Sequence, residues 1–322
     1  MLSQTSACGA PIGPPRLKPP SRPFAACLFV LALGLLPGCS IKSMAVEAVA
    51  DAMAESSATY ASDDDIAFVG LASPFGLKTT EGLIEAVPEH RGLLLAAARG
   101  FTQYAYVYIE QPANEIEDVD VSLAYAERTR AMHMYLRARD YGLRGLETTY
   151  PKITETILTD PESAVAITTV DDVPLLYWTA AAWASAISLS KDDPSLIADL
   201  PAVEALITRA YALDPSFDHG AIHVFLISYE MSQSGMHEDA ASRARRHFDR
   251  AVELCDGLQA APYVTFAEAV TIAEQNRDAY LRLLEEALSI DVDARPEWRL
   301  ANLVMQRRAR WLLAHTDDVF LE

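Results

Sequence analysis

Apolar side chains recur at helical spacing from about residue 63 almost to the C-terminus, and this regularity limits what the chain can fold into. Few turn-forming residues interrupt the pattern. The 322 residues include 14 glycines and 18 prolines, but four and seven of these lie in the first 38 residues. A protein with many short strands needs a turn about every ten residues. We therefore predict an all-α fold.

Acidic residues and prolines indicate where several helices begin and end. The acidic run Asp63–Asp65 precedes an apolar segment, as suits a helix N-terminus, and Pro88 ends that helix. A long amphipathic helix is expected from about Val119 to Leu146. Residues 147–171 are the least regular stretch, and the run Asp171-Asp172-Val173-Pro174 resembles another capped helix start.

Three helix pairs in the C-terminal part follow a similar pattern. Aligning Leu213, Leu254 and Ile290 at the ends of their first helices gives spacings of 41 and 36 residues. A tetratricopeptide repeat (TPR) has a 34-residue period and a comparable two-helix unit. Each pair would bury its apolar stripe only against its neighbours. We predict stacked antiparallel helix pairs, a TPR-like α-solenoid, over residues 63–322.

The first 38 residues have the composition of a signal peptide. Arg16, Lys18 and Arg22 form a basic region, and the 13-residue apolar run from Phe24 to Leu36 follows. That run is too short to span a bilayer comfortably but has the length of a signal-peptide core. We predict a lipoprotein signal peptide at 1–38 and a lipidated N-terminus with lead-in at 39–62.

The lipidation prediction depends on the sequence Leu36-Pro37-Gly38-Cys39-Ser40, which is similar to a bacterial lipobox. Cys39 would become the first mature residue and carry the acyl chains that hold the protein on a membrane. Pro37 departs from the small residue preferred there, and an ordinary signal peptide or a short anchor are the alternatives. Ser40, which is not acidic, favours the periplasmic face of the outer membrane. Cys255 would then be the one remaining thiol, in a core position.

The charge balance excludes one class of partner. The chain has 26 Lys and Arg against 45 Asp and Glu, and the first 38 residues contain three of the bases and no acid. The remainder therefore has a net charge of −22, without a basic cluster. Such a surface repels phosphate backbones, so we expect no nucleic-acid binding.

Catalytic and metal-binding motifs are weak. His219 and His223 have the i, i+4 spacing of many metal sites, but no Glu follows His219 and no third ligand is evident. The start of a packed helix is the alternative that we favour. The sequence has no glycine-rich phosphate loop and no nucleophile elbow. We predict a non-enzymatic protein without a metal site.

Aromatic residues are the best candidates for ligand binding. Phe101, Tyr104 and Tyr108 share one helix face, and Tyr177, Trp178 and Trp183 form a second group. Such side chains could line a groove or pore for an apolar ligand, with hydroxyls turned to water. Core packing is the other interpretation, and for residues at helical spacing we favour it.

Several segments occur in a characteristic order along the chain. They are Asp63–Asp65, Pro74–Lys78 with Glu81, Leu93–Ala98, Gly100–Tyr106, Leu175–Trp178 with Ala182 and Trp183, Arg209–Asp214 and Asp218–His223. This ordered set resembles the TatT family, the T component associated with some TRAP transporters.

The resemblance implies a periplasmic lipoprotein of stacked TPR-like helices that forms a homotrimer. It would bind the soluble solute-binding protein of a TRAP-type uptake system, and an apolar ligand would occupy a pore or groove. The alternative is a TPR-type scaffold that assembles envelope proteins and holds no ligand. A basic or neutral docking face on the partner would suit the acidic mature surface.

Overall fold

The computed structural model describes residues 9, 10, 13, 46–53, 57–232 and 239–321. The chain divides into two units, Met1–Met44 and Ala45–Glu322, and the fold described below is that of the second. Cys39 and most of the predicted signal peptide lie outside the described residues. None of the helices in the described ranges is both long and apolar enough to cross a membrane.

Helices account for all the regular secondary structure of the described residues, which confirms the all-α prediction. A helix covers residues 46–53. The first half then contains α3 (Ser57–Ala61), α4 (Ile66–Ala86), α5 (Arg91–Ala105), the π-helical turn η1 (Tyr106–Glu110), α6 (Gln111–Glu115), α7 (Val121–Glu147), α8 (Ile153–Thr156), α9 (Pro161–Ala166), the 3-10 turn η2 (Val170–Asp172), α10 (Val173–Ser188), α11 (Pro194–Ile197) and α12 (Leu200–Leu213).

The second half contains α13 (Phe217–Ser232), α14 (Ala240–Leu254), α15 (Ala261–Phe266), the π-helical turn η3 (Ala267–Thr271), α16 (Arg277–Ser289), the 3-10 turn η4 (Pro296–Trp298), α17 (Arg299–Ala314) and α18 (Thr316–Val319). Leu213 and Leu254 end α12 and α14, and Ile290 follows α16 directly. The three aligned residues thus hold equivalent places in three helix pairs.

Local capping explains several of the helix starts. The carboxylate of Asp65 accepts a hydrogen bond from the backbone N–H of Phe68 at 2.9 Å, at the start of α4. Asp120 accepts one from Leu123 at the start of α7, also at 2.9 Å. Each bond satisfies one of the N–H groups that a first helical turn leaves without a partner.

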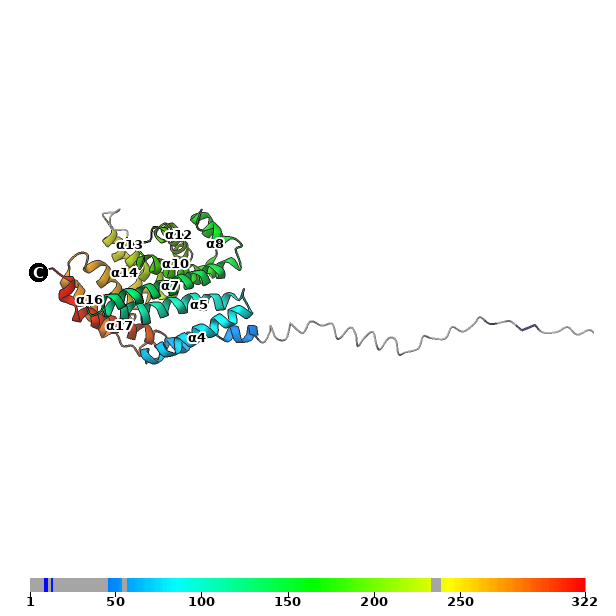
Figure 1. Ribbon diagram of the computed structural model, residues 1–322, viewed down its shortest axis with the longest axis horizontal. Coiled ribbons are helices and arrows are strands. Elements are labelled where there is room, and N and C mark those ends of the chain that lie inside the picture. The colour runs from blue at the N-terminus through cyan, green and yellow to red at the C-terminus, as the bar shows by residue number, and fades with distance from the viewer. Residues whose placement is uncertain (1–8, 11–12, 14–45, 54–56, 233–238, 322) are drawn as a thin grey trace, which may run out of the picture. The chain divides into compact units, whose positions relative to one another are not determined.

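The long helices of the first half stack as antiparallel neighbours in the order α4, α5, α7, α10 and α12 (Figure 1). The contacts between α5 and α7 show that these two helices are antiparallel. Arg91, at the start of α5, donates a hydrogen bond to Thr149, whereas Phe101, later on α5, stacks on Tyr141, which comes earlier in the chain than Thr149. Adjacent helices thereby bury their apolar stripes against one another.

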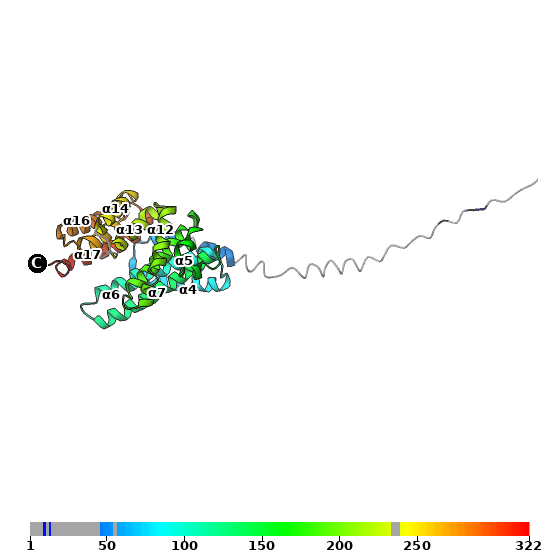
Figure 2. The same ribbon diagram turned by 90° about the horizontal axis from the view of Figure 1, so that it is seen from above.

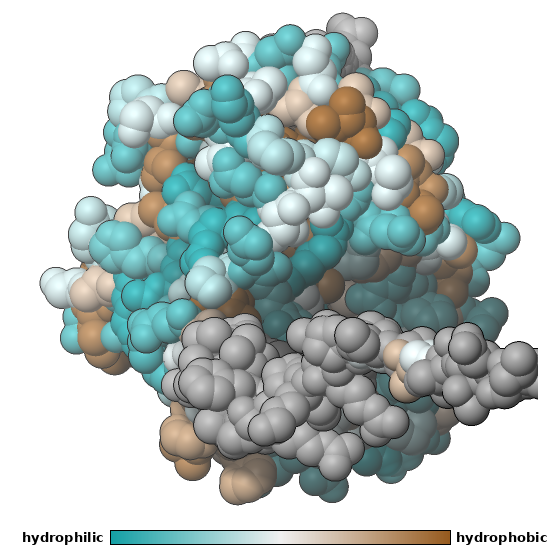
Figure 3. All heavy atoms as spheres, turned by 90° about the vertical axis from the view of Figure 1, so that its right-hand side faces the viewer, coloured by the Kyte–Doolittle hydropathy of each residue, from teal (hydrophilic) through white to brown (hydrophobic). Residues whose placement is uncertain are grey.

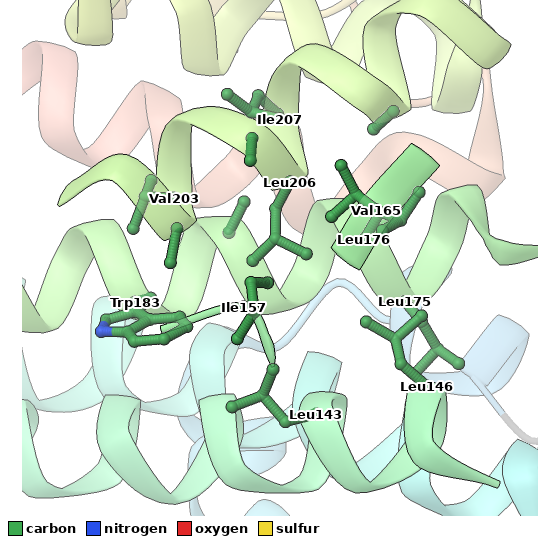
Figure 4. Packing of buried hydrophobic residues seen from close by; sticks show 14 of the residues in the cluster. Leu143, Leu146, Ile157, Val165, Leu175, Leu176, Trp183, Val203, Leu206 and Ile207 are labelled. Carbon is green, nitrogen blue, oxygen red and sulfur yellow. The ribbon is translucent and has the colours of Figure 1, made fainter. Parts of the chain in front are cut away.

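The largest core cluster lies between α7, α10 and α12, where Leu146, Leu175 and Leu206 are buried (Figure 4). Trp183 belongs to the same cluster and its ring lies beside the aliphatic side chains. Burial of side chains of this size stabilises the fold by about 1.5–3 kcal/mol each.

The second half folds as its own group of helices, and α17 then packs back onto the N-terminal elements. Figure 2 shows α14, α16 and α17 together, beside the stack of α4 and α7. The α17 side chain Arg307 donates to the backbone O of Val107 at 2.9 Å, and Arg299 donates to Ser62 O at 2.8 Å. An open solenoid leaves its first and last repeats apart. The helix pairs are present, but a TPR-like solenoid is not confirmed.

The surface of this unit is mainly hydrophilic with scattered apolar residues on the face shown in Figure 3. One exposed apolar group is regular. Phe68, Leu71 and Phe75 lie at i, i+3 and i+7 on α4 and are 61%, 82% and 79% exposed. We refer to these three residues as the α4 stripe.

Candidate functional site

Two of the six aromatic candidates are core residues. Phe101 is buried, stacks on Tyr141 with ring centroids 5.9 Å apart, and lies beneath the guanidinium of Arg137 at 5.3 Å. Trp183 is also buried, and its indole N–H donates to the carboxylate of Asp199 at 3.2 Å. Their burial supports the core-packing interpretation for this pair.

Tyr104 and Tyr108 form a half-buried ring pair on the N-terminal stack, with centroids 5.6 Å apart. The hydroxyl of Tyr108 donates to the backbone O of Ile66 at 3.0 Å, and burial raises its pKa to about 12. A Cβ atom on Gly70 would lie 2.6 Å from the Tyr108 ring, so this ring packs closely against α4. The Tyr108 hydroxyl therefore joins two helices.

Tyr177 and Trp178 belong to a second aromatic group, at the start of α10. The ring of Tyr177 meets Trp178 edge-on at 5.1 Å and lies 5.4 Å from Phe217, at the start of α13. Tyr177 and Trp178 are half-buried. Burial, with a smaller effect from the carboxylate of Asp218, raises the pKa of the Tyr177 hydroxyl. This hydroxyl has no hydrogen bond to another described residue.

Asp218 lies in an unusual turn of the backbone. Asp218, His219 and Gly220 have φ values of 46°, 53° and 102°, three consecutive residues in the left-handed region. Residues other than glycine adopt this conformation at a cost of about 1–2 kcal/mol each. Gly220 is needed because a Cβ atom there would lie 3.1 Å from Ala251 Cα. The turn lies near the start of α13, directly after Phe217, whose ring packs on Tyr177.

The same turn separates the two histidines that the sequence places at i, i+4. The imidazole of His219 packs on Trp298 with centroids 4.9 Å apart. The imidazole of His223 faces His247 instead, and their Nδ1 atoms are 2.9 Å apart. Among the residues that the structure describes, no three His, Cys, Asp or Glu side chains come close enough to hold a metal ion.

Arg99 on α5 is a candidate residue that sequence reasoning missed. Its side chain is half-buried, and burial lowers the pKa of the guanidinium while the Asp218 carboxylate acts in the opposite direction. Asp218 thus influences both Arg99 and Tyr177. One turn before Arg99, Leu95 is half-buried against the core cluster between α7, α10 and α12. In the sequence, Arg99 could have been noticed as the single charged residue within the apolar segment Leu93–Phe101.

A second polar group, around the π-helical turn η1, also has no counterpart in the sequence predictions. Glu110 accepts a hydrogen bond from the hydroxyl of Tyr135, and burial raises the pKa of Glu110. Arg308 of α17 donates to Glu268 of η3 at 2.7 Å, and both affect the electrostatics at Glu110. The cluster therefore joins both π-helical turns to α17.

Comparison with known proteins gives one family. Residues 62–320 match the family model described as TRAP transporter T-component. A protein from Treponema pallidum (strain Nichols), described as uncharacterized, is 29% identical over 317 residues, which cover 93% of this chain and 96% of that protein. The family match includes every helix from α4 to α17.

Proposed function

Because this chain belongs to the TRAP transporter T-component family, we propose that it is a non-enzymatic periplasmic lipoprotein that binds the solute-binding protein of a TRAP-type uptake system. The family match over residues 62–320 carries this proposal. It spans the helices from α4 to α18, so the proposed role is assigned to this helical fold and not to one part of it.

The α4 stripe is the surface that we assign to protein contact. Phe68, Leu71 and Phe75 expose most of their side chains on one helix face. Contiguous exposed apolar side chains are typical of protein interaction sites, because their removal from water stabilises a complex. The same stripe could join copies of this chain, since we also propose a homotrimer.

The aromatic group formed by Tyr177, Trp178 and Phe217 is the place that we propose for an apolar ligand. Half-buried rings bind apolar surface, and the Tyr177 hydroxyl supplies a polar group without a partner in the described structure.

Affinity capture tests which protein this chain binds. Full-length protein with a C-terminal tag is purified in detergent from its native host, and co-purifying proteins are identified by mass spectrometry. We expect a TRAP-type solute-binding protein. Recovery of envelope-assembly proteins without a solute-binding protein would favour the scaffold alternative.

A stripe variant shows which contact the α4 stripe makes. Leu71→Ser should reduce capture of the solute-binding protein, whereas Leu123→Ser changes an exposed leucine on α7 and serves as the control. Light scattering gives the mass of each variant. Unchanged capture together with a monomeric mass would assign the stripe to self-association instead.

We further propose that acyl chains on Cys39 anchor the protein to the periplasmic face of the outer membrane. Replacing Cys39 by Ser removes the thiol that would be acylated. We expect the variant to move from the outer-membrane fraction to the soluble periplasmic fraction. Retention of Cys39→Ser in the membrane fraction would contradict lipid anchoring at this residue.

A further inference from the structure

The α4 stripe lies at one end of the helical stack. α4 comes first in the order α4, α5, α7, α10 and α12, and its buried residues Leu77 and Ile84 belong to one core cluster with Leu93 of α5 (Figure 1). The end helix of a stack needs a polar outer face, because water covers it. The exposed side of α4 instead carries the apolar stripe. Further packing on this side would remove that apolar surface from water.

The charges at the two ends of the stripe differ in sign. Asp64 is exposed just before α4 begins, and the side chain of Lys78, in the second half of α4, is 72% exposed. Between them, the segment Ile66–Leu77 contains no charged residue. The exposed side of α4 is therefore an apolar strip with an acidic end and a basic end.

Lys78 is available to a partner outside its own chain. Its Nζ atom lies 2.5 Å from Oε2 of Glu81. The Glu81 carboxylate also accepts a hydrogen bond from the hydroxyl of Tyr141 at 2.8 Å and lies 3.5 Å from Nη1 of Arg137. Glu81 would therefore keep two partners if Lys78 turned to another carboxylate.

The stripe and its two flanking charges are self-complementary. Successive members of the set Asp64, Phe68, Leu71, Phe75 and Lys78 are 4, 3, 4 and 3 positions apart, the spacing of a coiled-coil seam. A second α4, rotated by half a turn about an axis at Leu71, would place its Phe75 on Phe68. It would also place its Lys78 beside Asp64, and each of these contacts would form twice. The two helices would be antiparallel, as neighbouring helices within the stack already are.

We propose that the α4 stripe packs antiparallel against the α4 stripe of a second copy of this chain, about a two-fold axis at Leu71. The inference rests on the protein-contact role proposed above for the stripe and names the protein that makes the contact. Leu71→Ser would then reduce capture of a solute-binding protein because the paired form, which offers two binding sites, is lost.

The two-fold pair is separate from the proposed homotrimer. In a two-fold contact both copies use the same patch, whereas each copy in a ring of three uses two different patches. Pairing through α4 would therefore join two trimers. The total mass should fall by half in Leu71→Ser, whether the remaining unit is a monomer or a trimer.

The size of the stripe determines how strong this pair should be. A buried phenylalanine removes about 150–250 Å² from water, so two stripes together would bury on the order of 1,000 Å². Stable protein interfaces bury about 1,200–2,000 Å². The pair should thus be weak in dilute solution and is best detected in the native host, where the proposed lipid anchor holds the copies on one membrane surface and raises their local concentration.

Cysteine cross-linking of the full-length protein in its native host tests the arrangement. Leu71→Cys should form a covalent dimer under mild oxidation, because a two-fold axis at Leu71 places this residue next to its own copy. Leu123→Cys, at an exposed leucine of α7, is the control and should form none on a non-reducing gel. Cys255 is buried and should not contribute.

A mixed experiment determines the direction of the two helices. Phe68→Cys and Phe75→Cys, produced together with different tags, should form a mixed covalent dimer. Produced alone, neither variant should link to itself. In the antiparallel pair, two copies of either residue would be displaced by about 9–12 Å along the helices, which is too far for a disulfide.

Charge reversal tests the two ends of the stripe. In the Leu71→Cys background, Lys78→Glu should lower the yield of covalent dimer, because Asp64 would then face a second carboxylate. Adding Asp64→Lys should restore the yield, since the two charges are exchanged and remain complementary.

Three outcomes would overturn the inference. They are absence of a covalent dimer in Leu71→Cys, self-linked Phe68→Cys as abundant as its mixed dimer with Phe75→Cys, and a double charge variant that pairs no better than Lys78→Glu. Cross-linking of Leu71→Cys to a solute-binding protein instead of its own copy would also overturn it, but would leave the proposed function intact. Conversely, a covalent dimer without capture of a solute-binding protein would support the pairing and contradict the proposed partner.

Discussion

At the residue scale, two glycines let α7 and α10 approach closely. A Cβ atom on Gly142 would lie 2.1 Å from Thr179 Oγ1, and one on Gly145 would lie 2.6 Å from Leu175 Cδ2. Thr179 cannot yield easily, because it is fully buried and its hydroxyl donates to the backbone O of Leu175 at 2.6 Å. The two helices can therefore pack this closely only because Gly142 and Gly145 have no Cβ atom.

Gly142→Ala should lower the free energy of unfolding by about 1–3 kcal/mol, the usual cost of forcing extra volume into a packed core. Gly82→Ala is the matched control, since no atom lies within 4 Å of its added Cβ. Alanine there should stabilise α4 by about 0.5–1 kcal/mol. Urea denaturation of both variants measures the two effects. Equal effects in the two variants would mean that the α7–α10 contact is not tightly packed.

His223 gives a prediction about pH. Burial, then the neighbouring His247 and Arg250, lower its pKa to about 4. As the pH falls, His223 of the unfolded chain therefore binds a proton near pH 6.5, whereas His223 of the folded protein binds one only near pH 4. The resulting stabilisation is present above about pH 6.5 and is lost as the pH falls towards about 4.

We expect His223→Gln to show a smaller loss of Tm between about pH 6.5 and 4 than the wild type does. His133→Gln, which changes an exposed histidine, is the control and should follow the wild type. Carboxylates also titrate in this pH range, so the Tm of every variant will change with pH. The test is therefore the difference in Tm loss between the variants and the wild type. Parallel curves for all three proteins would contradict the assignment to His223.

At the element scale, the π-helical turns η1 and η3 bring polar groups into the interior. Such turns are rare and are frequently found at functional sites. Tyr106 and Glu110 of η1 and Glu268 of η3 influence one another electrostatically, beside Arg308 of α17. The two turns therefore lie at a polar contact between the halves of the fold.

Glu110→Gln should raise the Tm at pH 8, because burial raises the pKa of Glu110 and makes its ionised form unfavourable in the folded state. The amide oxygen can still accept the hydrogen bond from Tyr135. Glu117→Gln provides the opposite case, since hydrogen bonding to Arg128 lowers the pKa of Glu117. That variant should be slightly destabilised, by less than about 1 kcal/mol for an exposed pair. A fall in Tm for Glu110→Gln would show that its charge is stabilising.

At the scale of the whole molecule, α17 joins the two halves through Arg307. Its guanidinium donates at 2.9 Å both to the backbone O of Val107 and to the side-chain oxygen of Gln111, which are 200 and 196 residues away in sequence. Ile66 and Val107 also pack against the core of the second half. These contacts join α17 and the core of the second half to residues of the first half, whereas the first and last repeats of an open solenoid stay apart.

Arg307→Met should weaken this closure and cost about 1–3 kcal/mol, because buried hydrogen-bond acceptors lose their donor. Hydrogen exchange should become faster in η1 and α17 while the α7–α10 core stays protected. Arg310→Gln, on the same helix but exposed, is the control. Uniform acceleration over the whole chain would show that the two halves do not open separately.

The sequence was sufficient to predict the helical class and several local features. Asp65 caps α4 as its acidic run indicates, and Leu213, Leu254 and Ile290 stand at equivalent places in three helix pairs. These features depend on side chains and backbone groups only a few residues apart. The family resemblance, too, could be recognised from ordered local segments, and the match over residues 62–320 confirms it.

Only the tertiary structure decided which aromatic candidate residues belong to the core. Phe101 and Trp183 have the same aromatic character in sequence as Tyr104 and Tyr177, but helix packing buries the first two and leaves the others half-buried. It also separated His219, which packs on Trp298, from His223, which faces His247. Burial and charge pairing depend on contacts between residues far apart along the chain, which local periodicity does not encode.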